Sequence, residues 1–281
     1  MNDPLPRTEQ GNPLSRGLGE LPAADVIALM NREEHQVLAA VEKATALLTR
    51  AAERIAAVFA AGGRTVFLGA GTSGRIALQE AAELPPTFGV PQEAFTVMAA
   101  GGALMGPAAI TPDEDDVLAA PNALSAMPIG PGDAVIGLAA SGTTPFVRAG
   151  VQAAARARAW TCGIAHNPGA PLLRDGELGI LLDTGPEVLT GSTRLKAGTA
   201  QKLALNRVTT AAMVLAGRVA GNHMIDLTGS TQKLQARAIR IVMDLGGLDE
   251  VNARQRLEAA GWSVRAALQP HPRRPDSPAG G

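Results

Sequence analysis

Residues 65–83 read TVFLGAGTSGRIALQEAAE, and this stretch decides the fold. Thr65 to Gly69 is a short apolar segment typical of a buried strand. A helical pattern follows from about Arg75 to Glu83, and Pro85 and Pro86 are expected to end it. A glycine loop lies between the two segments. A strand, a loop and a helix in this order form one unit of an α/β sheet.

The same alternation continues along the chain. A helical pattern follows Ser141-Gly142 and runs through Ala159, and an alanine-rich one runs from Ala197 to Ala216. The other strand-like segments are Ala94 to Ala100, Ala134 to Ala140, Thr161 to Ala165 and Leu178 to Asp183. We therefore predict an α/β fold with a doubly wound, five-stranded parallel sheet flanked by helices. Ligands bind at the carboxyl ends of the strands in such sheets.

The regions outside the sheet differ in character. Residues 1–22 are rich in Pro, Gly and polar residues and indicate an extended arm. Asn31 and Glu34 resemble a capped helix start, so we expect one long helix from there to Gly62-Gly63. The predicted divisions are an N-terminal arm and helix at 1–50, the sheet domain at 51–220, a helical region at 221–269 and a disordered tail at 270–281.

Composition excludes several classes of protein. The chain has 281 residues, a net charge of -1, 46% hydrophobic residues and 2% aromatic residues, so its core must be aliphatic. The near-neutral charge argues against nucleic-acid binding. We expect no secretory signal and no membrane segment, because the chain shows no basic start followed by an apolar core and no apolar run of about 20 residues. The single cysteine, Cys162, fits a reducing compartment, so we expect a soluble cytoplasmic protein.

Neither the histidines nor the cysteine suggests a metal site. His35, His166, His223 and His271 show no ligand spacing with one another or with Cys162. Metal ligation needs clustered ligands, so we expect no metal.

The glycine loop fits two kinds of ligand. Gly69 to Gly74 matches G-x-G-x-x-G, which alone suggests a dinucleotide. That interpretation also needs an acid at the end of the second strand, but the chain there reads Ala99-Ala100-Gly101-Gly102. The adjacent hydroxyls Thr72 and Ser73 favour a compact phosphate monoester instead. A purely structural role in a tight turn remains an alternative.

A second stretch, residues 185–202 with the sequence GPEVLTGSTRLKAGTAQK, also favours an anion. It places hydroxyls and two cations before a long helix, where unpaired N–H groups and the helix dipole attract negative charge. The candidate substrate- and phosphate-binding residues are Gly71, Thr72, Ser73, Ser141, Gly142, Thr144, Glu187, Ser192, Thr193 and Lys196.

Residues 185–202, and residues 69–89 with the sequence GAGTSGRIALQEAAELPPTFG, resemble signatures of the N-acetylmuramic acid 6-phosphate etherases, a family of sugar isomerase (SIS) domain proteins. The resemblance covers roughly residues 8–245. It implies a carbon–oxygen lyase that converts N-acetylmuramic acid 6-phosphate and water to N-acetylglucosamine 6-phosphate and D-lactate. It also implies a homodimer that acts in cell-wall sugar recycling without a metal or organic cofactor.

The resemblance assigns two catalytic carboxylates. The Glu-x-Pro-Pro motif places the first on Glu83, and a Glu-Asp pair after Gly101-Gly102 places the second on Glu114. By the resemblance Glu83 is the acid that protonates the departing lactate oxygen, and Glu114 is the base. The sequence alone does not separate the two roles.

Some positions depart from the family pattern. Gly11 and Thr143 stand where the family usually has arginine, Thr111 stands where it has a further glutamate, and the C-terminal helical region is shorter. The missing arginines favour one alternative, a non-catalytic phosphosugar sensor. A second alternative is a sugar-phosphate aldose-ketose isomerase, which shares the ring opening and proton abstraction. Whether the arm or His223 reaches a partner subunit is left open by the sequence.

Overall fold

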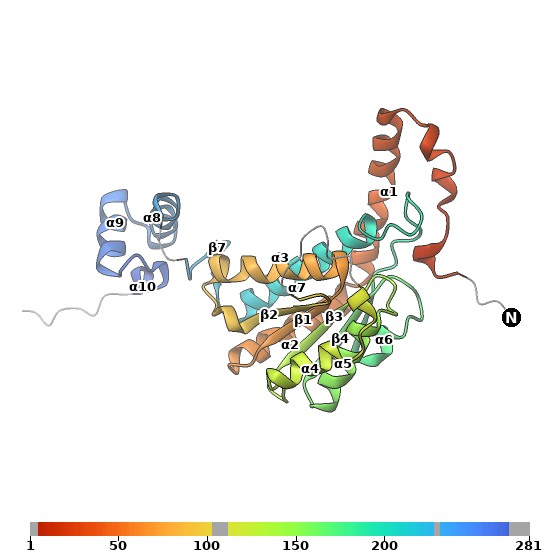
Figure 1. The fold of residues 1–281 in the computed structure, drawn as a ribbon. Helices are drawn as coiled ribbons and strands as arrows, with labels where there is room; N and C mark the ends of the chain where they lie inside the picture. Colours follow the sequence, from red (N-terminus) through yellow and green to blue (C-terminus); the bar gives the residue numbers. More distant parts are fainter. Residues whose placement is uncertain (1–4, 103–111, 228–230, 270–281) are drawn as a thin grey trace, which may run out of the picture. The chain divides into compact units, whose positions relative to one another are not determined.

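A computed structural model describes residues 5–102, 112–227 and 231–269. Its centre is a five-stranded parallel sheet with the strand order β2-β1-β3-β4-β5 (Figure 1). The strands are β1 (Thr65–Gly69), β2 (Phe95–Ala99), β3 (Ala134–Leu138), β4 (Trp160–Ala165) and β5 (Leu178–Leu181). Each predicted strand is therefore confirmed to within two residues at either end.

The strand order changes direction in the middle of the sheet. Gly69 at the end of β1 pairs with Ala99 of β2 on one side and with Leu138 of β3 on the other. The chain leaves β1 in one direction and β3 in the opposite direction, so the strand order reverses between them. Loops that follow adjacent strands diverge at such a point and leave a crevice at the carboxyl edge.

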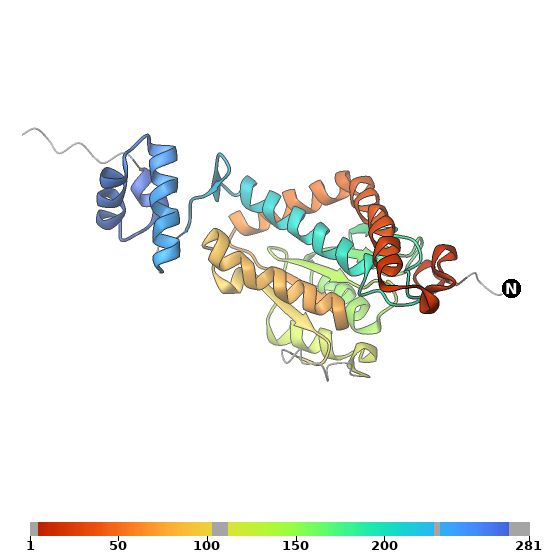
Figure 2. The same ribbon diagram turned by 90° about the horizontal axis from the view of Figure 1, so that it is seen from above.

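Helices cover both faces of the sheet, as the right-handed crossover rule requires. One face carries α4 (Ala119–Ala126), α5 (Pro145–Arg156) and α6 (Leu172–Asp175). The other carries α2 (Thr45–Ala60), α3 (Gly71–Phe88) and α7 (Lys196–Leu215) (Figures 1 and 2). The core between them is aliphatic, as the composition predicts. Among its buried members are Val66, Leu68, Val135, Val147 and Val151.

The N-terminal region differs from the prediction. The arm contains three short 3-10 turns, η1 (Arg7–Glu9), η2 (Pro13–Ser15) and η3 (Leu18–Glu20), and α1 (Ala23–Lys43) begins directly after Pro22. Asn31 therefore lies inside α1 and does not cap it. The helix starts earlier because Leu29 and Glu33 already belong to its buried face, which extends the apolar spacing toward the N-terminus. The predicted single long helix is two helices, since the chain breaks at Ala44 between α1 and α2.

The prediction that Pro85 and Pro86 end the helix after β1 is also wrong. Both prolines lie inside α3, which continues to Phe88. The two prolines cannot donate the hydrogen bonds that N–H groups at 85 and 86 would make to the preceding turn, and the helix ends two residues after Pro86, at Phe88. The N–H of Gly89 still bonds to the carbonyl of Pro85 at 2.9 Å and completes the helix end.

Contacts divide the chain into two units, residues 1–83 with 91–216 and residues 84–90 with 217–281. The second contains a small hairpin that the sequence did not predict and three helices around their own apolar core. These elements are β6 (Val219–Ala220), β7 (His223–Met224), α8 (Gln232–Gly246), α9 (Glu250–Ala259) and α10 (Val264–Leu268). The side chains of Thr231, Asp249 and Ser263 cap the three helices. The tail predicted at 270–281 lies outside the described residues.

Candidate active site

The glycine loop after β1 is shorter than the sequence suggests, because α3 starts at Gly71. A Cβ atom on Gly69 would lie 2.6 Å from the backbone nitrogen of Gly74, so only glycine allows the helix to start this close to the strand. Gly74 donates its N–H to the carbonyl of Ala70 at 3.2 Å. The residues before it, Gly71 to Ser73, form the first turn, whose N–H groups have no partner within the helix. This turn is a suitable place for a phosphate group.

The loop after β3 is held in one shape by its own contacts. The Ser141 hydroxyl accepts a hydrogen bond from the N–H of Thr143 at 3.2 Å. Gly142 has a φ of +70°, and a Cβ atom there would lie 2.5 Å from the Cβ of Ala170. Thr144 precedes α5 without capping it through its side chain. Since β3 is the neighbour of β1, these hydroxyls lie at the same edge of the sheet as Thr72 and Ser73.

The predicted anion-binding stretch at residues 185–202 leads into α7. The first turn of α7 meets the first turn of α3. A Cβ atom on Gly198 would lie 3.4 Å from the Cγ2 of Thr72 and 3.5 Å from the Cδ1 of Ile76. The absence of a side chain at Gly198 therefore brings the two helix starts together. Ser192 and Thr193 lie just before this contact, where their side chains are partly exposed.

Two predicted binding residues in this segment have partners within the protein. The Glu187 carboxylate accepts hydrogen bonds from the N–H groups of Lys196 at 3.1 Å and Ala197 at 2.9 Å, and so caps α7. Burial raises the pKa of Glu187, while these two N–H groups oppose the rise. The ammonium of Lys196 lies 2.7 Å from the Glu33 carboxylate and 3.3 Å from the Gln36 amide oxygen. Direct contact of Glu187 or Lys196 with a ligand stays a prediction.

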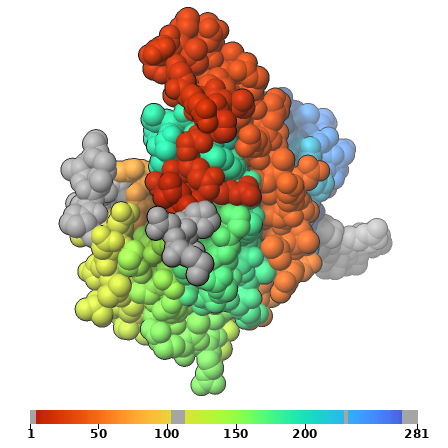
Figure 3. Space-filling view, turned by 90° about the vertical axis from the view of Figure 1, so that its right-hand side faces the viewer, coloured from red at the N-terminus to blue at the C-terminus, as the bar shows by residue number. Residues whose placement is uncertain are grey.

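The N-terminal arm lies against the carboxyl edge of its own sheet (Figure 3). Thr8 donates its N–H to the Asn167 side chain at 3.1 Å, and Asn167 donates to the Thr8 hydroxyl at 3.0 Å. Arg7 pairs with Asp183 at 2.8 Å. These contacts hold the arm next to the loop after β3, because Asn167 also donates to the carbonyl of Ser141 at 3.1 Å.

Gly11, one of the departures from the family pattern, lies beside the run before α7. A Cβ atom on Gly11 would be 3.9 Å from the Thr190 hydroxyl oxygen. Gly11 and Thr190 line a cavity of 570 Å³, and Arg16 lines it too. A guanidinium is therefore present in this cavity although position 11 has none.

The structure does not place the two predicted catalytic carboxylates together. Glu83 is exposed near the far end of α3, and Glu114 is exposed in a 3-10 turn, η5 (Pro112–Asp115). The family position Thr111 lies outside the described residues. Within the described part of the chain, neither Glu83 nor Glu114 makes a hydrogen bond or an ion pair.

A third carboxylate, Glu80, was not predicted. It is buried one turn before Glu83 and accepts hydrogen bonds from the Thr209 hydroxyl at 2.5 Å and the Asn206 amide at 2.7 Å. Lys202 bonds to the same Asn206 side chain at 2.8 Å. Burial raises the pKa of Glu80, the partners on α7 oppose the rise, and the charge of Glu83 adds to it. A polar residue on the inner face of an amphipathic helix is the only sequence signal that could have identified it.

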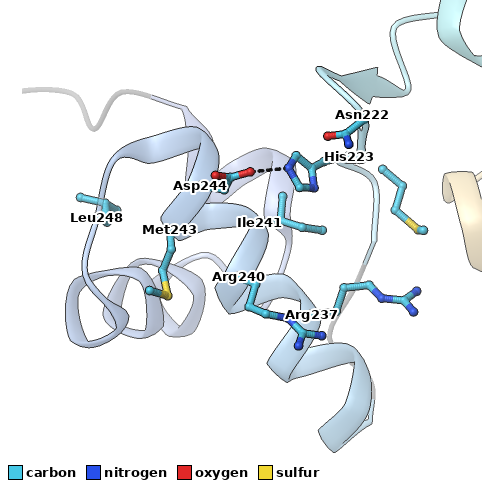
Figure 4. A pocket seen from close by; sticks show the side chains of 9 residues that line it. Asn222, His223, Arg237, Arg240, Ile241, Met243, Asp244 and Leu248 are labelled. Atoms are coloured by element: carbon cyan, nitrogen blue, oxygen red, sulfur yellow. Dashed lines mark hydrogen bonds and ion pairs between the residues drawn. The ribbon is translucent and has the colours of Figure 1, made fainter.

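The second unit has a pocket of its own (Figure 4). It has a volume of 690 Å³ and includes His223, whose Nε2 lies 2.7 Å from the Asp244 carboxylate. Arg237 and Arg240 project from α8 along the same pocket. The structure thus pairs His223 within its own unit, and the role of His223 in a partner's site stays a prediction.

In residues 5–102, 112–227 and 231–269, no group of three or more His, Cys, Asp or Glu side chains is arranged to hold a metal ion. None of the helices in those ranges combines the length and the apolar composition that crossing a membrane requires.

Comparison with known proteins decides the family. The chain is 43% identical over 263 residues to the N-acetylmuramic acid 6-phosphate etherase of Actinobacillus pleuropneumoniae serotype 5b, covering 93% of this chain and 86% of that one. It is 43% identical to the etherase of Deinococcus radiodurans, with 95% and 88% covered. The chain belongs to the N-acetylmuramic acid 6-phosphate etherase family. For the etherase of Cutibacterium acnes the identity is 42%, with 94% and 87% covered.

Other comparisons agree with the fold of this etherase family member. Residues 44–155 match the model of the glucokinase regulatory protein N-terminal SIS domain. The structure resembles a phosphoheptose isomerase from Francisella tularensis with a TM-score of 0.53 and 16% identity, covering 70% of this chain and 100% of that one. For the enzyme from Neisseria gonorrhoeae the TM-score is 0.52 and the identity 18%, with 69% and 99% covered. The predicted SIS-like sheet is thereby confirmed.

Proposed function

We propose that this chain cleaves the lactyl ether of N-acetylmuramic acid 6-phosphate and releases N-acetylglucosamine 6-phosphate and D-lactate. The observation that carries the proposal is the identity of 43% to named etherases over 93% of the chain. In this proposal the enzyme acts in the cytoplasm, in the recycling of cell-wall sugars, as a homodimer and without a metal or organic cofactor.

The phosphate is proposed to bind at the start of α3. The N–H groups of the first turn and the hydroxyls of Thr72 and Ser73 supply donors there, and the helix dipole favours the negative charge. Ser141, Gly142 and Thr144 line the neighbouring edge of the crevice. Ser192 and Thr193 approach it through the contact between α7 and α3 at Gly198.

The chemistry calls for two carboxylates in different protonation states. Opening the sugar to its aldehyde makes the proton on the adjacent carbon, C2, acidic. A base removes that proton, the bond between C3 and the lactyl oxygen breaks, and an acid protonates the departing oxygen. Water then adds to C3 of the unsaturated aldehyde. On the resemblance to the family motif we assign the acid to Glu83 and the base to Glu114. An ionised and a protonated carboxyl group are both needed at neutral pH.

The test is release of D-lactate from N-acetylmuramic acid 6-phosphate, measured with a D-lactate dehydrogenase. We expect release by the wild type and a loss of about 100-fold or more in Glu83→Gln and in Glu114→Gln. Asp115→Asn is the matched control for Glu114, because it removes an exposed acid from the same 3-10 turn. A folded wild type that binds the sugar phosphate but releases no lactate would instead support the sensor.

A further inference from the structure

We propose that Arg16 binds the carboxylate of the lactyl group, in a cavity between the N-terminal arm and the turn at residues 189–192. The inference rests on the proposed etherase function and deepens it, because the substrate carries two anionic groups. Its phosphate, on C6, is proposed to bind at the start of α3. The lactyl carboxylate, on the substituent of C3, therefore needs a separate site.

The cavity lies between two segments that are far apart in the sequence. It has a volume of 570 Å³, and its lining comes from the arm and from the chain just before α7. The turn in the second segment is closed by the N–H of Ser192, which donates to the carbonyl of Leu189 at 2.9 Å. Leu18, Val188 and Leu189 form the apolar part of a lining that also contains Arg16. A lactyl group, with a methyl group next to a carboxylate, matches this combination.

Two polar side chains of the cavity have no partner within the protein. Asn12 donates to the Glu33 carboxylate at 2.5 Å, and the Ser15 hydroxyl donates to the Asn12 carbonyl at 3.3 Å. In the described part of the chain, the Arg16 guanidinium and the Thr190 hydroxyl make no such bond. A guanidinium presents two parallel N–H donors that match the two oxygens of a carboxylate, and a hydroxyl can add a third hydrogen bond.

Both walls of the cavity lead to the crevice at the carboxyl edge of the sheet. Thr8 of the arm is held by Asn167, which also donates to the carbonyl of Ser141 at 3.1 Å. On the other wall, Thr190 lies three residues before Thr193, so their Cα atoms are at most about 11 Å apart. The phosphate and the lactyl group leave opposite sides of the sugar ring. One bound sugar can therefore place its phosphate at the start of α3 and its carboxylate in the cavity.

A neighbouring charge and the exposure of Arg16 limit the expected effect. A Cβ atom on Gly191 would lie 3.3 Å from the Oε2 atom of Glu9, so a negative charge lies near the same turn and opposes an anion. Arg16 is exposed, and water screens an exposed charge. Both conditions favour a value at the lower end of what hydrogen bonds to a charged group contribute. We therefore expect Arg16 to raise the affinity for the substrate about 10-fold.

The first measurement is the rate of D-lactate release at increasing concentrations of N-acetylmuramic acid 6-phosphate. Arg16→Gln should raise KM about 10-fold and leave kcat within about twofold of the wild type, because the carboxylate takes no part in the bond changes. Arg50→Gln is the matched control. It removes an exposed arginine of α2 that does not line the cavity, and it should leave KM unchanged.

The second measurement separates the carboxylate from the phosphate as the group that Arg16 binds. Binding is measured by titration calorimetry in the Glu83→Gln background, where turnover is expected to be about 100-fold slower or more. N-acetylmuramic acid 6-phosphate carries both anionic groups, whereas N-acetylglucosamine 6-phosphate carries only the phosphate. Arg16→Gln should weaken binding of the first about 10-fold and leave binding of the second unchanged. Equal weakening of both would overturn the inference and assign Arg16 to the phosphate.

A compensating substitution tests whether the carboxylate binds in this cavity. Gly11 lines the same cavity, and among the described residues a Cβ atom there meets nothing closer than the Thr190 hydroxyl oxygen at 3.9 Å. Gly11→Arg in the Arg16→Gln background should therefore return a guanidinium to the cavity and recover most of the lost affinity. An unchanged KM in Arg16→Gln overturns the role of Arg16 while the etherase function stands. A wild type that releases no lactate overturns the proposed function, and this inference with it.

Discussion

The Nζ atom of Lys196 lies 2.7 Å from the Oε2 atom of Glu33, and the two side chains are only 2% and 4% exposed. Asn12 of the arm donates to the same Glu33 oxygen at 2.5 Å. This pair therefore joins the arm, α1 and the start of α7. Through these two contacts Glu33 holds the start of α7 and the N-terminal arm in place.

We expect removal of one partner of this pair to destabilise the protein strongly. Glu33→Gln or Lys196→Met leaves the other charge buried without its counter-ion, which costs about 3–5 kcal/mol. The free energy of unfolding, measured by urea titration, should fall by that amount. The double variant Glu33→Leu/Lys196→Met should recover much of the loss, because it buries no charge. Glu250→Gln, which breaks the exposed pair with Arg254, should cost less than about 1 kcal/mol and is the control.

Because His166 is buried, we expect the free energy of unfolding to depend on pH. Burial lowers the pKa of His166 to about 4, against the opposing effect of the Leu182 backbone. Its pKa in the unfolded chain is about 6.5, so the unfolded state binds more protons between these values. The contribution of His166 to stability is complete above pH 6.5 and is lost as the pH falls toward 4, by about 3 kcal/mol. The difference in unfolding free energy between wild type and His166→Leu should follow this curve; a constant difference from pH 4 to pH 7 would contradict it.

For Glu80 we expect the opposite dependence of stability on pH, over an overlapping pH range. Because the pKa of Glu80 is raised in the native state, mainly by burial, the native state binds the proton more tightly than the unfolded chain. Its effect on stability is most favourable below the usual glutamate pKa and weakens as the pH rises through the native value. Glu80→Gln keeps one acceptor oxygen, which can serve either Thr209 or Asn206, and cannot ionise. Urea titrations at several pH values should therefore show Glu80→Gln gaining stability relative to wild type as the pH rises.

Gly142 is expected to tolerate no side chain. Its φ of +70° is unfavourable for other residues, and a Cβ atom would lie 2.5 Å from Ala170 Cβ and 2.8 Å from Ala165 Cβ. Gly142→Ala should lower the free energy of unfolding by about 2 kcal/mol or more, and distortion of the loop should raise KM for the phosphorylated sugar. Gly17→Ala is the matched control, since no atom lies within 4 Å of that position, and it should change stability by less than about 0.5 kcal/mol. Equal effects of the two substitutions would refute this role of Gly142.

Local patterns in the sequence were sufficient for most of the sheet. The strand from Thr65 to Gly69 was predicted with the bounds that the structure gives, because a buried parallel strand needs a continuous apolar run. Helix bounds were less predictable. Pro85 and Pro86 lie inside α3 and do not end it. Asn31 did not start α1, since burial of Leu29 extends the helix beyond a local capping signal.

The sequence predicted the types of residue at the site: hydroxyls and glycines at the carboxyl edge from local patterns, and the carboxylates Glu83 and Glu114 from the family resemblance. Only the tertiary structure decided which of them meet. In the structure Lys196 forms an ion pair with Glu33, and the Glu187 carboxylate caps the start of α7. Glu83 and Glu114 lie on opposite faces of the sheet. The physical reason is that composition and spacing record which groups are present, whereas the packing of helices on a sheet sets the distances over which those groups act.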